Sequence, residues 1–142
     1  MRLLVCGSRG WKDSDVIARE MAPFLADGGP RVVIHGAAPG ADAIAGWLAH
    51  FGFCVYTEEF PADWTEGKRA GPLRNARMLA EGKPDRGLAF GPLYRADGKR
   101  TGTGDMVQRM LPKDPARRLP VRWVAAPDAP AVDLTEMPEP PT

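Results

Sequence analysis

Three stretches of the sequence place glycines and other small residues beside polar side chains. They are "CGSRGW" (residues 6–11), "HGAAPGAD" (35–42) and "RTGTGD" (100–105). Glycine lets backbone N–H groups approach an anion closely, and the N-terminus of a helix adds roughly half a positive charge. One such loop is more often only a tight turn, but three of them favour a cradle for phosphate and ribose. These stretches supply the candidate ligand-binding residues Gly7, Ser8, Arg9, Gly36, Gly40, Asp42, Gly102, Thr103 and Asp105.

The polar side chains of these loops each have a functional and a structural interpretation. Arg9 either grips a phosphate with two parallel hydrogen bonds or is a solvated surface arginine. Asp42 and Asp105 fall in the first turn of a helix, where they either stabilise its dipole or accept hydrogen bonds from ribose hydroxyls. His35 is expected to be a satisfied core or turn residue. The two histidines and two scattered cysteines have no ligand spacing, so we expect neither a metal site nor a cofactor.

The stretch "FPADWTEGKRAGPLRNARM" (60–78) is the least generic part of the chain. Trp64 lies beside several cations, and it either stacks on a base or is buried against the edge of a sheet. Arg74 and Met78 are four residues apart and therefore share one face of a helix. Trp64, Arg74 and Asn75 complete the candidate ligand-binding set.

The elements that position these residues follow from short apolar runs that alternate with helix-like stretches. The runs span residues 2–6, 31–35, 53–57, 86–90 and 119–124, and they mostly lack polar alternation, as in strands buried on both faces. The helix-like stretches begin near Asp13 or Ser14, Asp42, Pro72 and Thr103. The alternation predicts an α/β fold, a Rossmann-like parallel sheet with helices on both faces in three layers. In such folds ligands bind beyond the carboxyl ends of the strands.

Composition sets limits on the partners and the compartment. The chain has 142 residues and a net charge of +1, which gives no general attraction to nucleic acid or membrane. No apolar run approaches membrane-spanning length. Cys6 and Cys54 lie in apolar runs, which favours buried thiols and a cytoplasmic location. Cations concentrate in residues 95–122, whereas residues 125–142 hold four acids, five prolines and no base.

The charge and proline pattern predicts two parts. Residues 1–125 form the nucleotide-ligand-binding domain, and residues 126–142 form a Pro- and acid-rich tail that is extended or disordered.

Four motifs together resemble the YspA-type (cpYpsA-related) branch of the SLOG superfamily. They are "GSRGWKD", "VVIHGAAPGAD", "FPADWTEGKRAGPLRNARML" and "GTGDM", and the resemblance covers most of residues 1–111. It implies a Rossmann-like fold that binds nucleotides or nucleotide-derived ligands. Relatives include the Lonely-guy phosphoribohydrolases and the DNA-processing protein DprA. Members of the superfamily are commonly dimers, so the resemblance also implies a homodimer.

The match to the Lonely-guy enzymes is incomplete at the residues that carry catalysis. Arg74, Asn75 and Met78 match their Arg-Lys-x-x-Met helix with Asn in place of Lys. Their second motif, P-G-G-x-G-T-x-x-E, ends in a catalytic Glu, and Met106 stands at that place. Asp105 is one residue earlier, about 100° around the helix. The Pro-Gly-Gly portion is replaced by an insertion of polar and basic residues.

Three functions follow from these observations. The favoured one is binding or sensing of a nucleotide-derived small molecule. The first alternative is an N-glycosidic hydrolase of a nucleoside monophosphate, in which Arg74 and Asp105 are catalytic. The second is a single-stranded nucleic-acid binder that uses the basic stretch 95–122, and the near-neutral total charge counts against it.

Overall fold

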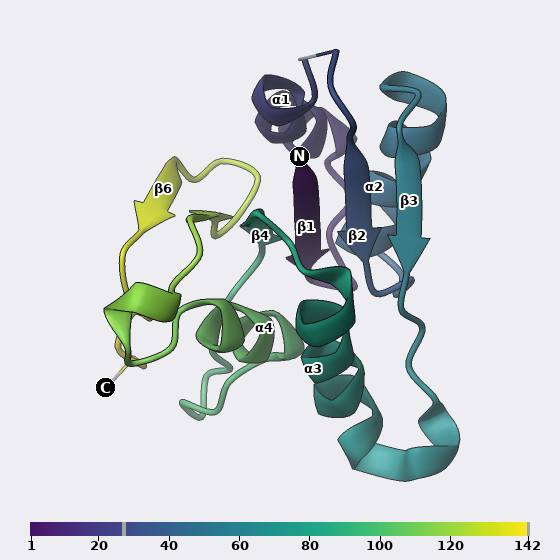
Figure 1. Cartoon of the computed structure of the whole chain (residues 1–142). Coiled ribbons are helices and arrows are strands. Elements are labelled where there is room, and N and C mark those ends of the chain that lie inside the picture. The colour runs from purple at the N-terminus through teal and green to yellow at the C-terminus, as the bar shows by residue number, and fades with distance from the viewer. Residues whose placement is uncertain (27, 142) are drawn as a thin grey trace.

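A computed structural model describes residues 1–26 and 28–141 and contains a six-stranded sheet in the order β3-β2-β1-β4-β5-β6 (Figure 1). The strands are β1 (Arg2–Gly7), β2 (Val32–His35), β3 (Tyr56–Glu59), β4 (Arg86–Phe90), β5 (Val121–Val124) and β6 (Ala131–Leu134). The longer helices are α1 (Ser14–Leu25), α2 (Ala41–Trp47), α3 (Ala70–Gly82) and α4 (Gly102–Met110). Strands β1 to β5 run parallel, and β6 pairs antiparallel with β5.

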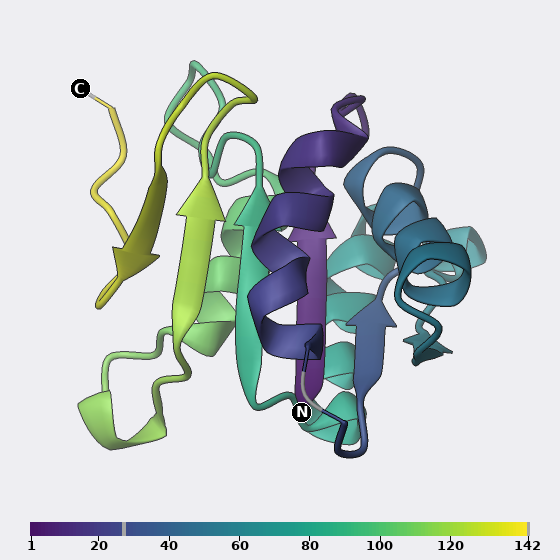
Figure 2. The same ribbon diagram turned by 90° about the horizontal axis from the view of Figure 1, so that it is seen from above.

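The helices cover both faces of the sheet, which confirms the predicted α/β, Rossmann-like fold (Figure 2). Helices α1 and α2 pack with one face of the strands around a core that includes Leu3, Val5 and Ile17. Helices α3 and α4 pack with the other face around Leu4, Met78 and Met106. This division follows from the strand order, because the chain adds strands on one side of β1 first and then crosses to the other side.

The predicted position of the third strand is wrong by several residues. The run 53–57 contains Cys54, whose φ of 54° turns the chain, and the strand begins only at Tyr56. Preceding residues 48–52 continue α2 as a π-helical turn, which displaces the start of the strand. Cys54 is also exposed rather than buried, whereas Cys6 is buried as expected.

Side-chain caps define where two helices begin. Asp13 accepts a hydrogen bond from the backbone N–H of Val16 at 3.1 Å, which confirms the predicted start of α1. Thr101 caps α4, and its hydroxyl accepts from the N–H of Gly104 at 2.9 Å. The predicted start near Thr103 is close, but Thr101 rather than Thr103 is the capping residue, and Thr103 lies within the first turn.

Residues 126–142 contain a strand that the sequence pattern did not indicate. Strand β6 adds to the edge of the sheet, so the predicted boundary after residue 125 falls between two paired strands. Partly buried Leu134 and Met137 pack against the core on the α3–α4 side. Val132 stays exposed, and the segment is held on the sheet chiefly because β5 supplies a free edge for backbone pairing.

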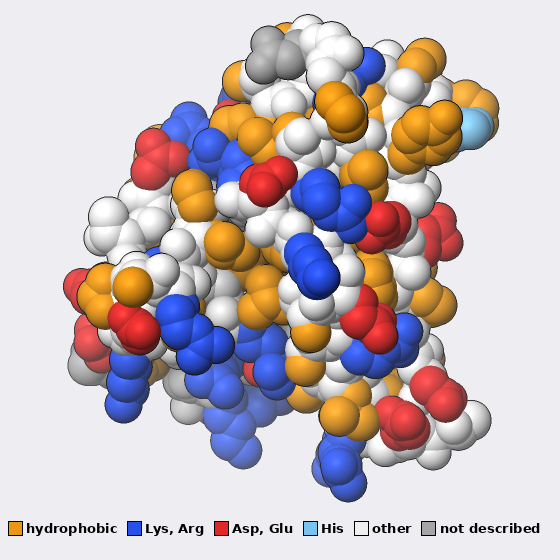
Figure 3. Space-filling model, in the orientation of Figure 1, with side chains coloured by type: hydrophobic (Ala, Val, Ile, Leu, Met, Phe, Trp, Pro, Cys, Tyr) orange, Lys and Arg blue, Asp and Glu red, His pale blue; other side chains and the backbone are white. Residues whose placement is uncertain are grey.

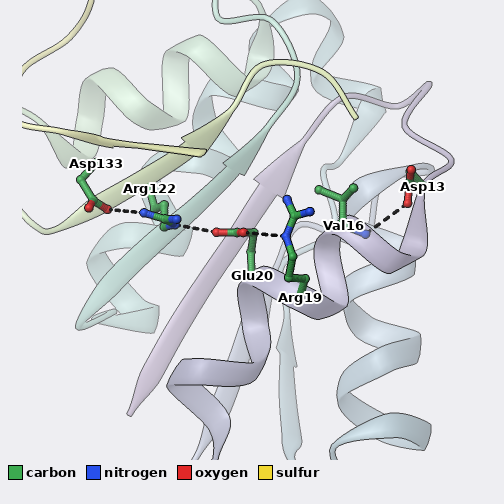
Figure 4. Close-up of polar contacts among 6 residues, drawn as sticks. All are labelled: Asp13, Val16, Arg19, Glu20, Arg122 and Asp133. Carbon is green, nitrogen blue, oxygen red and sulfur yellow. Dashed lines mark hydrogen bonds and ion pairs between the residues drawn. The ribbon is translucent and has the colours of Figure 1, made fainter. Parts of the chain in front are cut away.

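An ion-pair chain connects β6 to α1 across β5 (Figure 4). Arg122 on β5 donates to Glu20 on α1 at 2.5 Å and to Asp133 on β6 at 3.2 Å. Arg19 lies 3.1 Å from the same Glu20 carboxylate. Burial alone would raise the pKa of Glu20, but the hydrogen bonds from Arg122 and Arg19 lower it below its ordinary value of 4.5.

Loss of Arg122 should destabilise the fold in a pH-dependent way. Arg122→Ala leaves the buried Glu20 carboxylate with Arg19 alone, so we expect the free energy of unfolding at pH 7 to fall by about 2 kcal/mol. A carboxyl with a lowered pKa stabilises above its unfolded value of 4.5, and this contribution is lost as the pH falls. The difference between variant and wild type should therefore shrink in acid.

Urea unfolding at neutral and acidic pH measures this difference. Arg117→Ala, which removes an exposed cation, is the matched control. An equal loss at both pH values would show that Arg122 acts through packing rather than through charge.

Candidate functional site

The reversal of strand order between β1 and β4 places a crevice at the carboxyl edge of the sheet. The N–H of Ser8, just beyond β1, donates to the carbonyl of Phe90 at the end of β4 (2.8 Å). A cleft of about 270 Å³ opens there. Most of the predicted ligand-binding residues line it: Gly7, Ser8, Arg9, Asp42, Arg74, Asn75, Gly102 and Thr103.

The loop after β2 turns its backbone amides toward its own side chains. The N–H groups of Gly36 and Ala38 donate to the Asp42 carboxylate at 3.1 and 3.4 Å. The N–H of Ala37 donates to His35 Nδ1 at 3.0 Å, as expected for a turn residue, but the buried Nε2 of His35 has no hydrogen-bond partner among the described residues. The prediction that this loop offers these amides to an anion is therefore wrong. Asp42 already takes the place of that anion.

Gly40 lets this loop approach the loop after β1. It has a φ of 79°, and an added Cβ would lie 2.6 Å from the backbone carbon of Arg9. The N–H of Ala41 donates to the carbonyl of Ser8 at 3.1 Å, which holds the two loops together. Gly36 and Gly40 thus lie behind the cleft rather than among its lining residues, and they shape it through close packing.

Arg74 is fixed in the wall of the cleft by neutral partners. Its Nη1 donates to the carbonyl of Gly36 at 2.6 Å, and its Nε donates to Asn75 Oδ1 at 2.9 Å. Within the described residues Arg74 makes no ion pair and its Nη2 has no hydrogen-bond partner; Glu81 pairs with Arg77 instead. Arg74 presents an oriented guanidinium to the cleft.

Burial shifts the titration of the two charged groups at the base of the cleft. Desolvation raises the pKa of Asp42 to about 6, and the amide of Ala38 and the charge of Arg74 offset only part of this effect. Burial likewise lowers the pKa of Arg74, which nearby Asp42 partly restores. The two groups depend on each other, because each is the nearest opposite charge for the other.

Asn75 joins α3 to the start of α4. Its Nδ2 donates to the carbonyl of Gly102 at 3.2 Å and to Asp105 Oδ2 at 3.0 Å. Asp105 also accepts from Arg109 at 2.9 Å, and Arg100 lies 4.0 Å away. Asp105 does not line the cleft, and its negative charge is compensated by Arg109. This geometry counts against Asp105 as a general acid or base.

Trp64 stands at the entrance and is 57% exposed. The alternative that it is buried against the sheet edge is therefore wrong. The guanidinium of Arg9, which is exposed, lies 5.0 Å from the centre of its ring and makes a cation–π contact with it.

Some lining residues were not singled out from the sequence. Cys6, Pro92 and Thr101 all contribute to the cleft wall. Burial raises the pKa of the Cys6 thiol, so this side chain is a neutral part of the wall. Pro92 carries no polar signal, but its place directly after the buried run 86–90 marks it as a residue of the same sheet edge.

Neither a metal cluster nor a spanning helix occurs in residues 1–26 and 28–141. No group of three or more His, Cys, Asp or Glu side chains there is arranged to hold a metal ion. No helix in that part of the chain has the length and apolar character needed to cross a membrane.

Comparison with known proteins assigns the family. The profile of the YspA, cpYpsA-related SLOG family matches residues 1–67. The "Gene 61 protein" of Mycobacterium phage D29 is 44% identical over 110 residues, which cover 70% of this chain and 82% of the phage protein. The chain belongs to the YspA, cpYpsA-related SLOG family. Comparison with solved structures gave no match.

Asp42 should make stability depend on pH in a defined direction. The carboxyl has an ordinary pKa of 3.8 and a pKa of about 6 in the folded protein. The folded state therefore binds more protons between these values, and this contribution to stability is complete below a pH of about 4 and lost as the pH rises through about 6. Asp42→Asn keeps an oxygen acceptor for the amides and removes the titration. From about pH 4 to about pH 7.5, its stability relative to wild type should rise by about 2–3 kcal/mol.

Urea unfolding of both proteins across this range measures the effect. Asp128→Asn, at an exposed aspartate, is the control and should show no such trend. Titration of the Asp42 carboxyl near 3.8 in an NMR experiment would contradict the assignment.

Proposed function

We propose that this protein binds a nucleotide or a nucleotide-derived small molecule in the cleft between β1 and β4, as a sensor or binding protein. The observation that carries the proposal is Arg74, a cation held in place by two neutral hydrogen bonds at the wall of a switch-point crevice. Membership in the SLOG family supports a nucleotide-related ligand. A homodimer stays a prediction.

The start of α4 offers a second contact for the same anion. Gly102 and Thr103 line the cleft at the N-terminus of this helix. Thr101 satisfies the amide of Gly104 through its side chain and that of Asp105 through its carbonyl. Within the described residues the amides of Gly102 and Thr103 have no partner. A phosphate in the cleft would therefore meet a guanidinium from α3 and helix N–H groups from α4.

Binding is better supported than N-glycosidic hydrolysis. Met106, at the place of the Lonely-guy Glu, is fully buried in the core between the sheet and α4. The Asp105 carboxylate accepts hydrogen bonds from Asn75 and Arg109, and it does not line the cleft. Neither position supplies a free carboxylate to the cleft. Incubation with a panel of nucleoside monophosphates and detection of released base tests the catalytic alternative, and base release above the uncatalysed rate would favour it.

Arg74→Ala should weaken the binding of phosphate-bearing ligands selectively. Loss of a charge-assisted contact typically costs about 1.5–3 kcal/mol, or roughly ten- to a hundredfold in affinity. We expect this loss for a nucleoside monophosphate and a much smaller one for the nucleoside itself. Arg74→Lys should restore only part of the affinity for the monophosphate, because an ammonium group cannot form the two parallel hydrogen bonds of a planar guanidinium.

Calorimetric titration with both ligands measures these losses. The matched control is Arg77→Ala, which removes a half-exposed arginine of the same helix that pairs with Glu81. Equal losses for the nucleoside and its monophosphate would mean that Arg74 supports the structure and does not contact the phosphate.

Gly36→Ala should produce a similar defect without removing the arginine. Gly36 has no left-handed φ, so alanine fits the backbone, but an added Cβ would collide with the guanidinium of Arg74 and lie 2.8 Å from Asp42 Oδ2. We expect a folded protein with about tenfold weaker binding of a nucleoside monophosphate, because the displaced guanidinium loses its orientation.

Circular dichroism verifies the fold of this variant, and calorimetry measures its affinity. Gly52→Ala, where the added methyl makes only an ordinary contact with Leu48 at 3.8 Å, is the control. Unchanged affinity in a folded Gly36→Ala protein would show that the orientation of Arg74 has no part in binding.

A further inference from the structure

A second, larger hollow of about 600 Å³ adjoins the cleft, and we call it the outer basin. Five cations line it, with Asp105 as the single acid: Arg9, Lys68, Arg74, Lys99 and Arg100. It shares Arg9, Arg74 and Gly102 with the cleft, so the two spaces are continuous. Figure 3 shows Lys and Arg side chains gathered along the lower edge of the molecule, below α3 and α4.

One wall of the outer basin is the inserted segment that replaces a Pro-Gly-Gly sequence. Residues 91–101 fold into a tight hairpin, in which the N–H of Arg95 donates to the carbonyl of Lys99 at 2.7 Å. Thr101 closes its base, because its N–H donates to Leu93 at 3.0 Å and its hydroxyl to Pro92 at 2.7 Å. The returning limb therefore holds Lys99 and Arg100 at the basin.

The opposite wall is the short helical segment Trp64–Arg69. Asp63 caps it and accepts from the N–H of Thr65 at 3.1 Å. Gly67, with a φ of 70°, introduces a kink between the two parts of the segment. Trp64 and Lys68 face the basin from this side, and Arg9 covers the ring of Trp64.

Several cations of the outer basin lack partners of the kind that hold Arg95, Arg118 and Arg122 elsewhere in the basic stretch. Arg122 pairs with Glu20 and Asp133, and Arg95 lies 3.3 Å from Asp97. Arg118 donates to three backbone carbonyls. In the basin, Asp105 is already occupied by Arg109 at 2.9 Å and lies 4.0 Å from Arg100. Within the described residues, Lys68 and Lys99 form no ion pair. Positive charge is therefore left uncompensated at this place.

We propose that the outer basin is a second anion subsite, so that the ligand of this protein carries at least one further phosphate beyond the one held in the cleft. This inference rests on the proposed function and extends it from a nucleoside monophosphate to a diphosphate-bearing nucleotide derivative. Cations held close together repel one another, and a bound anion relieves that repulsion. The small cleft holds one end of such a ligand, and the basin holds the next charged group.

A small molecule fits this arrangement better than a nucleic-acid strand. Strand binding needs a track of cations along the surface, and three cations of the basic stretch, Arg95, Arg118 and Arg122, are engaged in internal contacts instead. Uncompensated positive charge gathers in one hollow that opens directly into the cleft.

The test compares ligands that differ by one phosphate. Calorimetric titrations use adenosine 5′-monophosphate, adenosine 5′-diphosphate, inorganic phosphate and inorganic pyrophosphate. The variant is Lys99→Ala/Arg100→Ala, which keeps the backbone hydrogen bonds that close the hairpin. The control is Lys113→Ala/Arg117→Ala, which removes the same charge from exposed positions of the basic stretch outside the basin.

We expect wild type to bind the diphosphate at least about tenfold more tightly than the monophosphate. The Lys99→Ala/Arg100→Ala variant should lose this advantage while its affinity for the monophosphate changes less than about threefold, and the control should behave as wild type. Equal affinities in wild type, or equal losses for both nucleotides in the variant, would overturn the inference.

Two further outcomes separate the inference from the proposed function. If pyrophosphate binds in a way that depends on Lys99 and Arg100 but neither nucleotide binds better than its inorganic counterpart, the nucleotide proposal fails and the anion subsite stands. If oligo-deoxythymidine binds more tightly than either nucleotide, with a steep salt dependence that the variant removes, the basin is a nucleic-acid contact and the small-molecule inference fails.

Discussion

The carboxylate of Asp42 lies buried beneath the cleft, and the local structure is arranged to compensate its charge. It accepts the amides of Gly36 and Ala38, which sets the course of the loop after β2. That loop in turn presents the carbonyl of Gly36 to Arg74, which fixes the guanidinium. Burying a carboxylate without hydrogen bonds or a nearby cation would greatly reduce the free energy of unfolding. The positions of the loop, of Asp42 and of Arg74 are therefore determined together. The orientation of the Arg74 guanidinium in the cleft therefore depends on contacts within the protein itself.

The sequence predicted the features that depend on local pattern. Continuous apolar runs identified β1, β2, β4 and β5, because strands buried on both faces need no polar alternation. Small residues after the strands indicated the sheet edge where the cleft lies. Strand β6 was missed because it is stabilised by pairing with β5 and by the distant contacts of Arg122, neither of which leaves a signal in its own residues. Gly36 correctly indicated a close-packed loop at the sheet edge. The sequence could not show that its amide points to Asp42, because that direction depends on how the loop and the helix pack together.

The inserted hairpin explains how this chain differs at the site from the Lonely-guy pattern it resembles. A glycine-rich turn binds phosphate through backbone amides, whereas the hairpin of residues 91–101 supplies the side chains of Lys99 and Arg100 at the same end of the sheet. Asn75 stands where the pattern has Lys, and it joins α3 to α4 through Gly102 and Asp105. Both changes replace parts associated with cleavage by parts that hold charge or connect helices. These differences support the proposed binding of an anion over cleavage.

The hydroxyl of Tyr94 donates to the backbone carbonyl of Pro138 at 2.6 Å, and Tyr94 also bridges to Arg100 across the hairpin. The segment after β6 thus anchors the loop that carries the entrance cations. Since the contact uses a main-chain oxygen, the side chain of residue 138 itself can vary without loss of the anchor. The number of residues between β6 and that carbonyl is not free, because adding or removing one would shift the oxygen away from Tyr94. In the C-terminal segment of this protein, amino-acid substitutions should therefore be tolerated much more readily than insertions or deletions.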